Sequence, residues 1–229
     1  MKKVVVVACF ATLFSSLSLY AQTAEQLRVQ QQFFYHYGKV YQKGVSGTGL
    51  TGPQYLYDDW RPMKIKNKDF EVDMAAVKMN LHTSMLEVMY EGEEKLIYPK
   101  DIEYVSFKEE GISRKFYPAQ RYSYGKTPLE GFMEVAGDEP EQILVHHYTG
   151  IKEPGPSANI VGGPTDNVLV KTTKTYINAS GKLIQVKNKK QFAKYFKGRS
   201  KKAETLIKER KTDFKNPYQL YEVLRLVRE

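Results

Sequence analysis

Residues 168–186, VLVKTTKTYINASGKLIQV, decide the fold. The first eleven are rich in Thr and Val and include Tyr176, as is typical of a β-strand. Asn178-Ala179-Ser180-Gly181 supplies a tight turn, and KLIQV returns as a second strand. Strands joined by so short a turn are antiparallel. We therefore expect a hairpin here and an antiparallel sheet around it.

The chain upstream of this hairpin contains more strand patterns. They cover 63–67, 68–83, 84–90, 94–99, 102–107, 114–122, 132–137 and 142–152. Pro118 predicts that 114–122 lies at a sheet edge, because proline cannot donate to the ladder. In 68–83 the apolar positions change parity after Met74, which predicts a β-bulge near Ala75 and Ala76.

Helical patterns lie at the two ends of the chain. We expect a helix over 22–37, a Gly-rich segment over 38–53, and an aromatic segment, QYLYDDWRP, that docks onto the core. After Val186 the period becomes helical. Gly198 suits a helix end and Ser200 a helix start. Asn216-Pro217-Tyr218-Gln219 combines a capping residue, Pro at the first helical position and Gln at the third.

These patterns predict an α+β protein, with a mostly antiparallel curved sheet or partly closed barrel and helices at the C-terminal end. We divide the chain into a signal peptide (1–21), a helix with a Gly-rich lead-in (22–59), an antiparallel β domain (60–187) and basic C-terminal helices packed on the same domain (188–229). Residues 153–167 contain three Pro and three Gly and are expected to form a loop.

The first residues have the pattern of a secretory signal peptide. Lys2 and Lys3 precede an apolar stretch over 4–14, followed by small and polar residues. Cleavage is expected after Ala21, with Ser18 as the second choice. The apolar run is shorter than the roughly 20 residues that span a bilayer. We expect an exported protein, periplasmic, outer-membrane-associated or secreted, with no transmembrane span in the mature chain.

The single cysteine, Cys9, lies inside the predicted signal. The mature chain would then have no disulfide, no thiol nucleophile and no zinc site built on sulfur. No cofactor motif is present, since the glycine clusters at 47–50 and 162–164 lack the context of a phosphate loop. We predict no cofactor and no catalytic or metal residues.

A hydrolase of cell-wall glycans or peptides is the alternative enzymatic hypothesis. It would require that two or more of six side chains converge in one cleft, namely Asp58, Asp59, Glu91, Glu93, His146 and His147. His146 and His147 are adjacent in a predicted strand, so they point to opposite faces and cannot easily share a metal. His36 and His82 have no partner at ligand spacing.

Positive charge is concentrated at the C-terminal end. Residues 182–229 hold 15 Lys and Arg against 5 Asp and Glu, a net charge of +10, whereas the whole chain carries +9. The residues proposed to bind a polyanion are Lys189, Lys190, Lys194, Lys197, Arg199, Lys201 and Lys202. Because an exported protein does not meet nucleic acid, we expect an anionic envelope polymer or an envelope protein as the partner. A solvated polar helix face is the simpler interpretation of the same residues.

Three segments resemble a group of exported Bacteroidota proteins without an assigned function. They are GPQYLYDDWRP, EVMYEGEEKLIYPKDIEYVSF and the C-terminal run from KTYINASGKLIQV to the end, within residues 52–229. The resemblance implies a secreted or periplasmic β-rich domain with a helical end, and it transfers no active-site residue. We thus expect a non-enzymatic binding or structural envelope protein. The alternatives are the hydrolase and an accessory component of an outer-membrane or secretion assembly, which an exposed apolar patch would favour.

Overall fold

The computed structural model describes residues 24–40, 51–125, 127–138, 140–153 and 167–229. Within these residues, eleven strands form one antiparallel sheet in the order β1-β5-β4-β3-β2-β6-β7-β10-β11-β12-β13. The strands are β1 (Lys39–Val40), β2 (Arg61–Lys66), β3 (Glu71–Met79), β4 (Leu86–Tyr90), β5 (Glu93–Ile97), β6 (Tyr104–Glu109), β7 (Ile112–Pro118), β10 (Phe132–Ala136), β11 (Glu141–Lys152), β12 (Val168–Ala179) and β13 (Lys182–Val186). β8 (Ser123–Tyr124) and β9 (Thr127–Pro128) pair separately.

The sheet consists of two meanders joined side by side. β2 to β5 form the first, β6 and β7 with β10 to β13 form the second, and β2 pairs with β6 at the junction. The edge strands β1 and β13 lie at opposite ends of the strand order, so the sheet is open and not closed into a barrel. This confirms the expected α+β class with a mostly antiparallel sheet.

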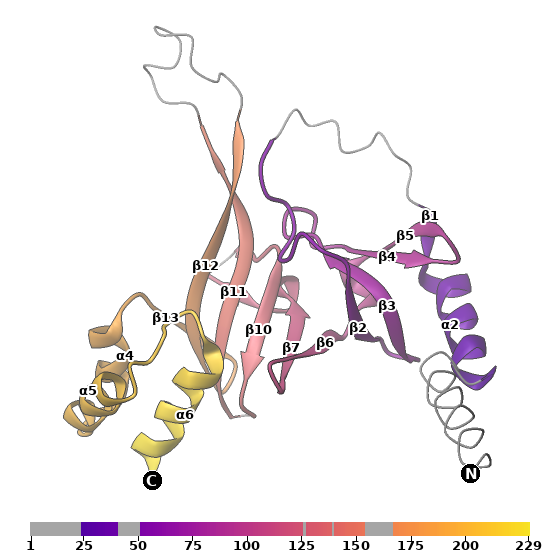
Figure 1. The fold of residues 1–229 in the computed structure, drawn as a ribbon. Coiled ribbons are helices and arrows are strands. Elements are labelled where there is room, and N and C mark those ends of the chain that lie inside the picture. The colour runs from indigo at the N-terminus through magenta and orange to yellow at the C-terminus, as the bar shows by residue number, and fades with distance from the viewer. Residues whose placement is uncertain (1–23, 41–50, 126, 139, 154–166) are drawn as a thin grey trace, which may run out of the picture.

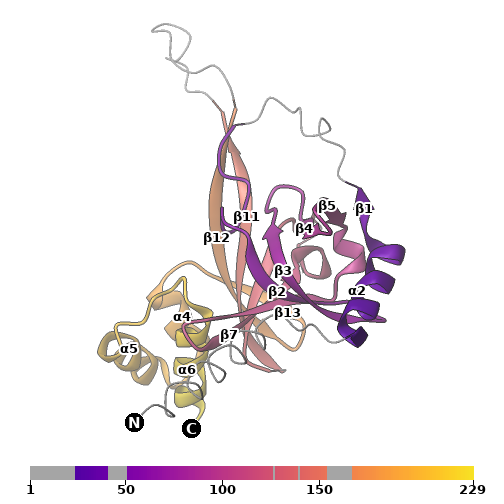
Figure 2. The ribbon, with the colours of Figure 1, turned by 45° about the vertical axis from the view of Figure 1, so that its right-hand side comes forward.

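The helices lie at opposite ends of the molecule (Figure 1). α2 (Ala24–Tyr37) packs beside the first meander, whereas α4 (Lys189–Tyr195), α5 (Ser200–Glu209) and α6 (Pro217–Arg228) gather at the second (Figure 2). Two short 3₁₀ turns, η1 (Pro99–Asp101) and η2 (Ala119–Arg121), complete the elements. α2 contributes Phe33 and Phe34 to one apolar core, and α4 to α6 form a second core against Ile143, Ile177 and Val186.

The local features predicted from alternation and turn chemistry are confirmed. Arg61 pairs with Val77 and Met63 pairs with Met74, so Ala75 and Ala76 together oppose one residue of β2. This is the expected β-bulge, and it turns the apolar side chains of both halves of β3 to the core. In the β12–β13 turn, Ser180 and Gly181 both have positive φ, as hairpin turns of the I′ type require.

Two local predictions are wrong. Pro118 does not mark an edge, because β7 lies between β6 and β10. The proline is tolerated because it is the last residue of the strand. Ser200 does not cap α5 from outside, since it is the first residue of the helix and its hydroxyl donates to the Phe196 carbonyl at 3.2 Å. Asn216 does cap α6, as predicted, by accepting from the backbone N–H groups of Tyr218 and Gln219.

Several predictions fall outside the described residues. These are the signal peptide with its cleavage sites and Cys9, most of the Gly-rich segment and most of the loop over 153–167. Among the helices that the structure describes, none has the length and apolarity needed to cross a bilayer.

Candidate functional site

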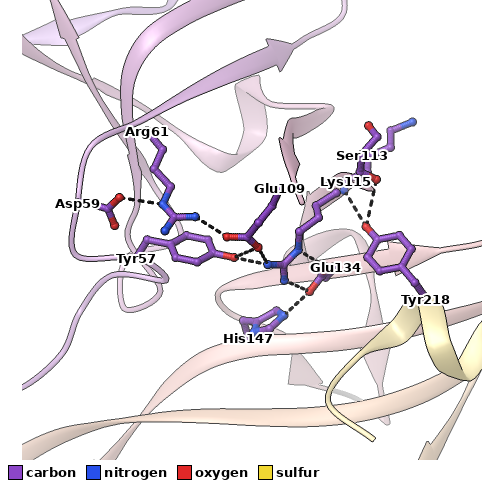
Figure 3. A network of polar contacts seen from close by, with 10 residues as sticks. Tyr57, Asp59, Arg61, Glu109, Ser113, Lys115, Glu134, His147 and Tyr218 are labelled. Carbon is purple, nitrogen blue, oxygen red and sulfur yellow. Dashed lines mark hydrogen bonds and ion pairs between the residues drawn. The ribbon is translucent and has the colours of Figure 1, made fainter. Parts of the chain in front are cut away.

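A buried ionic network lies where the second meander meets α6 (Figure 3). Its centre is Glu134 on β10, whose side chain is fully buried. Arg114 on β7 donates to both carboxylate oxygens, from Nε at 2.6 Å and from Nη2 at 2.7 Å. His147 Nε2 on β11 lies 3.0 Å from the second oxygen. Two-point pairing of this kind is the strongest contact that Arg and a carboxylate make.

The network continues from Arg114 toward solvent. Arg114 Nη1 donates to the Tyr57 hydroxyl and to Glu109 on β6. Arg61 Nη1 donates to the other oxygen of Glu109 at 2.7 Å, and Arg61 Nε donates to Asp59 at 3.0 Å. The Arg61 guanidinium also stacks on the Tyr57 ring, 3.7 Å from its centroid. The aromatic segment is therefore fixed to the sheet by alternating charges.

Strand register explains why these side chains meet. Glu134 pairs with Phe116 of β7, two residues from Arg114, and Phe132 pairs with His147. Residues two apart in a strand share a face, so Arg114, Glu134 and His147 all point to the side that the helices cover. Tyr218 of α6 lies beside the network, and its hydroxyl donates to the Ser113 carbonyl of β7 at 3.3 Å (Figure 3).

The electrostatics keep the network in one ionisation state. Burial pushes the pKa of Glu134 upward, but hydrogen bonds from His147 and Arg114 outweigh it and leave that pKa below the ordinary value. The pKa of Glu109 is lowered in the same way, against burial, by Arg61 and Arg114. Burial raises the pKa of the Tyr57 hydroxyl to about 12. Both carboxylates are thus ionised and Tyr57 neutral at physiological pH.

A small cavity of about 200 Å³ adjoins the network. Glu109, Arg114 and Glu134 line it together with Asp213, Lys215 and Tyr218 from the segment that leads into α6. The lowered pKa values of Glu109 and Glu134 keep both carboxyl groups ionised, so neither is prepared to act as the general acid that glycoside hydrolysis needs. Within the described residues, His, Cys, Asp and Glu form no cluster suited to a metal.

The six side chains that the hydrolase would need are not brought into one cleft. Asp59 and His147 lie at opposite ends of the network, separated by Arg61, Glu109, Arg114 and Glu134. The other four are placed elsewhere: Asp58 is exposed beside Lys171, Glu91 and Glu93 belong to the β4–β5 hairpin, and His146 points to the opposite face of β11.

The seven basic residues predicted from the C-terminal run are all exposed. Arg199 is nevertheless occupied, because its Nη1 donates to the carbonyls of Val227 and Arg228 at 2.6 Å each and so caps the end of α6. In the part of the chain that the structure describes, no ion pair involves the other six, which are Lys189, Lys190, Lys194, Lys197, Lys201 and Lys202.

No protein-family model, curated protein or solved structure matches this chain.

Sequence reasoning missed Arg114 and Glu134 as a pair. The signal was Glu134 itself, in the strand FMEVA, where all five residues are buried. A carboxylate in a strand covered on both faces needs a cationic partner. The pattern does not say which cation supplies it, because Arg114 is twenty residues away and their meeting depends on strand register.

Proposed function

We propose that this protein is a non-enzymatic binding protein of the cell envelope and that α4 and α5 hold it to an anionic polymer. The six lysines without ion-pair partners carry the proposal. Export is part of it and is supported by the basic start and apolar stretch of residues 2–14. The resemblance to exported Bacteroidota proteins supports the same location.

The lysines suit a repeating anion because they are presented on a rigid unit. Phe192, Ala193 and Phe196 bury one side of α4, and Ala203 and Ile207 bury one side of α5. The basic side chains therefore occupy the remaining, exposed sides of the two helices, with Lys197 on the segment between them. Their long stems let the ammonium groups adapt to spaced charges, as expected for recognition of a polymer rather than of one small anion.

Arg199 has a different role. It holds the end of α6 to the start of α5, so its removal would disturb the helical unit rather than a contact with the polymer. It is therefore excluded from the binding residues in the test that follows.

Salt-dependent binding tests the proposal. The mature protein is mixed with purified lipopolysaccharide and, in parallel, with vesicles containing anionic phosphatidylglycerol, and co-sedimentation is measured at low and high salt. We expect binding that falls steeply with salt, because exposed charges are screened within about 10 Å at 0.1 M ionic strength. A quadruple variant, K189Q/K190Q/K194Q/K197Q, should lose at least about tenfold in affinity.

The matched control removes the same charge elsewhere. Lys39, Lys68, Lys100 and Lys152 are exposed and lie outside both the helical unit and the groove described below. The variant K39Q/K68Q/K100Q/K152Q should bind within about twofold of the parent if the position of the charge matters. Equal losses in the two variants would mean that net charge alone drives association, and the proposed binding face would be abandoned.

The hydrolase has less support, because its six side chains are dispersed and the Glu109 and Glu134 carboxylates beside the small cavity are ionised. The accessory-component hypothesis also has less support. The large apolar residues that are exposed come from α2, β4, β7, β8 and the β11–β12 hairpin. Single exposed residues on separate elements are ordinary for a protein surface.

A further inference from the structure

A groove of about 530 Å³ runs over β2, β3, β6 and β7, away from the lysines of α4 and α5. The polar side chains that line it are Lys64, Glu71, Asp73, Tyr104, Ser106, Lys108 and Ser113. Its volume falls within the range of about 300–1,000 Å³ that is usual for small-ligand sites. The lysines proposed to contact the polymer do not line this groove, so the polymer contact does not explain it.

Strand register places these groups on one face. Lys64 pairs with Asp73 on one side and with Ser106 on the other, and Ser106 pairs with Lys115. Directly paired residues point to the same side of a sheet. The opposite face carries the first apolar core, including Ile65, Val72 and Val105. The groove therefore lies on the outer face of the sheet, and the opposite face of the same strands packs against the first apolar core.

The charges that line the groove are balanced. Among the lining side chains, Lys64 and Lys108 oppose Glu71 and Asp73, and Lys64 Nζ lies 2.9 Å from Glu71. Lys115 is not a lining residue, and its ammonium group lies over the Tyr104 ring. A charged ligand would meet as much repulsion as attraction here. Balanced donors and acceptors instead suit an uncharged ligand with many hydroxyl groups, which accepts from ammonium groups and donates to carboxylates.

Free hydrogen-bonding groups lie within the groove. Within the described residues, the Ser106 and Ser113 hydroxyls and the Lys108 ammonium make no hydrogen bond to the protein. Ser106 is partly buried, on the floor between Lys64 and Lys115. These groups can bond a ligand without first breaking a contact inside the protein.

An aromatic ring stands beside these polar groups. Lys115 Nζ lies 3.9 Å from the centroid of the Tyr104 ring, and the Tyr117 ring is 5.9 Å away. These contacts hold Tyr104 in place, so little side-chain freedom is lost when a ligand packs against it. A fixed ring next to hydroxyl, ammonium and carboxylate groups offers apolar contact to C–H groups and hydrogen bonds to hydroxyls in one site.

We propose that this groove binds an uncharged oligosaccharide, with Tyr104 as the ring against which a sugar packs and Asp73, Ser106 and Lys108 as hydrogen-bonding residues. Because the site is neutral, its binding is insensitive to salt. It is thus independent of the lysine face on α4 and α5 and does not rest on the polymer contact.

The experiment uses the mature chain and four neutral tetrasaccharides, built from glucose in α or β linkage, N-acetylglucosamine or mannose. Binding is followed by NMR chemical shifts. At least one should bind with a millimolar or tighter Kd, and that Kd should change less than about twofold between low and high salt. Tyr104→Ala and Asp73→Asn should each weaken binding about tenfold.

Two further variants make the result decisive. Ser106→Phe fills the floor of the groove and should abolish binding even if Tyr104→Ala disturbs the fold. Tyr124→Ala removes an exposed tyrosine outside the groove and should leave binding unchanged. Binding by K189Q/K190Q/K194Q/K197Q should also be unchanged, which separates this site from the polymer contact. The proposal is overturned if none of the four sugars binds, or if binding survives both Tyr104→Ala and Ser106→Phe.

Discussion

Glu134 shows how a single residue can determine the stability of this fold. Its carboxylate is fully buried and ionised, and Arg114 supplies two of its hydrogen bonds. Removing one partner of a buried pair is costly because the other charge stays buried without compensation. We expect Arg114→Met to lower the free energy of unfolding by about 3–5 kcal/mol, as measured by urea denaturation.

Two variants calibrate this loss. Arg210→Met breaks an ion pair whose side chains are nearly half exposed, Arg210 with Glu222, and should cost no more than about 1 kcal/mol. Combining Arg114→Met with Glu134→Leu removes both buried charges and should recover most of the loss. If Arg114→Met were as mild as Arg210→Met, the buried pair would not be an important source of stability.

His146 gives the stability a pH dependence. Burial lowers the pKa of His146 from 6.5 to about 4, and Nδ1 has no hydrogen-bond partner among the described residues. Between these pKa values the unfolded chain binds a proton that the folded chain does not, so stability falls as pH falls. Each pH unit in this window costs up to about 1.4 kcal/mol. From about pH 7.5 to about pH 5 we expect a loss near 2 kcal/mol.

The measurement is urea denaturation at several pH values for the parent and for His146→Gln. The variant keeps a donor for the Glu130 carbonyl that His146 Nε2 contacts but does not titrate, so its stability should change less over the same range. The window stays above pH 5 because the lowered pKa values of Glu109, Glu134 and Glu141 cost stability only at lower pH. Parallel pH profiles for the two proteins would contradict the assignment to His146.

At the scale of elements, the docking of α6 depends on a glycine. Gly137 has φ of +88°, and a Cβ there would lie 2.0 Å from the Tyr221 ring of α6. Gly92 has a similar φ of +78°, but a Cβ there would meet nothing within 4 Å. We expect Gly92→Ala to cost about 1–2 kcal/mol from backbone strain alone. Gly137→Ala should cost about 1–3 kcal/mol more, because the helix must move.

Denaturation of the two alanine variants tests this difference, and hydrogen exchange locates it. Faster exchange of the α6 amides in Gly137→Ala, with unchanged exchange in Gly92→Ala, is the expected pattern. Equal costs in the two variants would mean that the strand and α6 are not packed as closely as the structure shows.

The elements that the sequence predicts are those whose pattern is local. The β-bulge at Ala75 and Ala76 follows from a change of parity, and the cap at Asn216 from residue types three apart. The prediction that Pro118 lies at a sheet edge was wrong. Proline lacks a backbone N–H, but this matters only where the sheet needs a donor, and the last residue of a strand does not need to donate. Strand order, which brings β6 beside β2, depends on long-range pairing that has no local signature.

The candidate sites also differ in whether a local sequence pattern predicts them. The exposed lysines of α4 and α5 could be read from composition and helical period. The network around Arg114 could not, because four segments contribute to it: the aromatic segment with Tyr57, the β6–β7 pair, β10 and β11. The groove at Tyr104 requires that β2 and β6 be neighbours. The groove forms only when the two meanders join, whereas the network depends on strand pairing inside the second meander and reaches the first through Arg61.

At the scale of the whole molecule, the two apolar cores to which the helices contribute should unfold together. One sheet runs through both, and the network from Tyr57 to His147 ties the aromatic segment, the first core and the β10–β11 pair to one another. The only tryptophan, Trp60, contacts Lys78 of β3 in the first meander, so its fluorescence reports on that half. Circular dichroism at the helical band reports mainly on α4 to α6.

We expect the two signals to change with one midpoint in urea, as a two-state transition requires. Arg114→Met should lower both midpoints together, with Arg210→Met as the control that shifts neither by much. If the helical signal were lost at lower urea than the fluorescence, the C-terminal helices and their strands would be an independent folding unit, and the network would not couple the two cores.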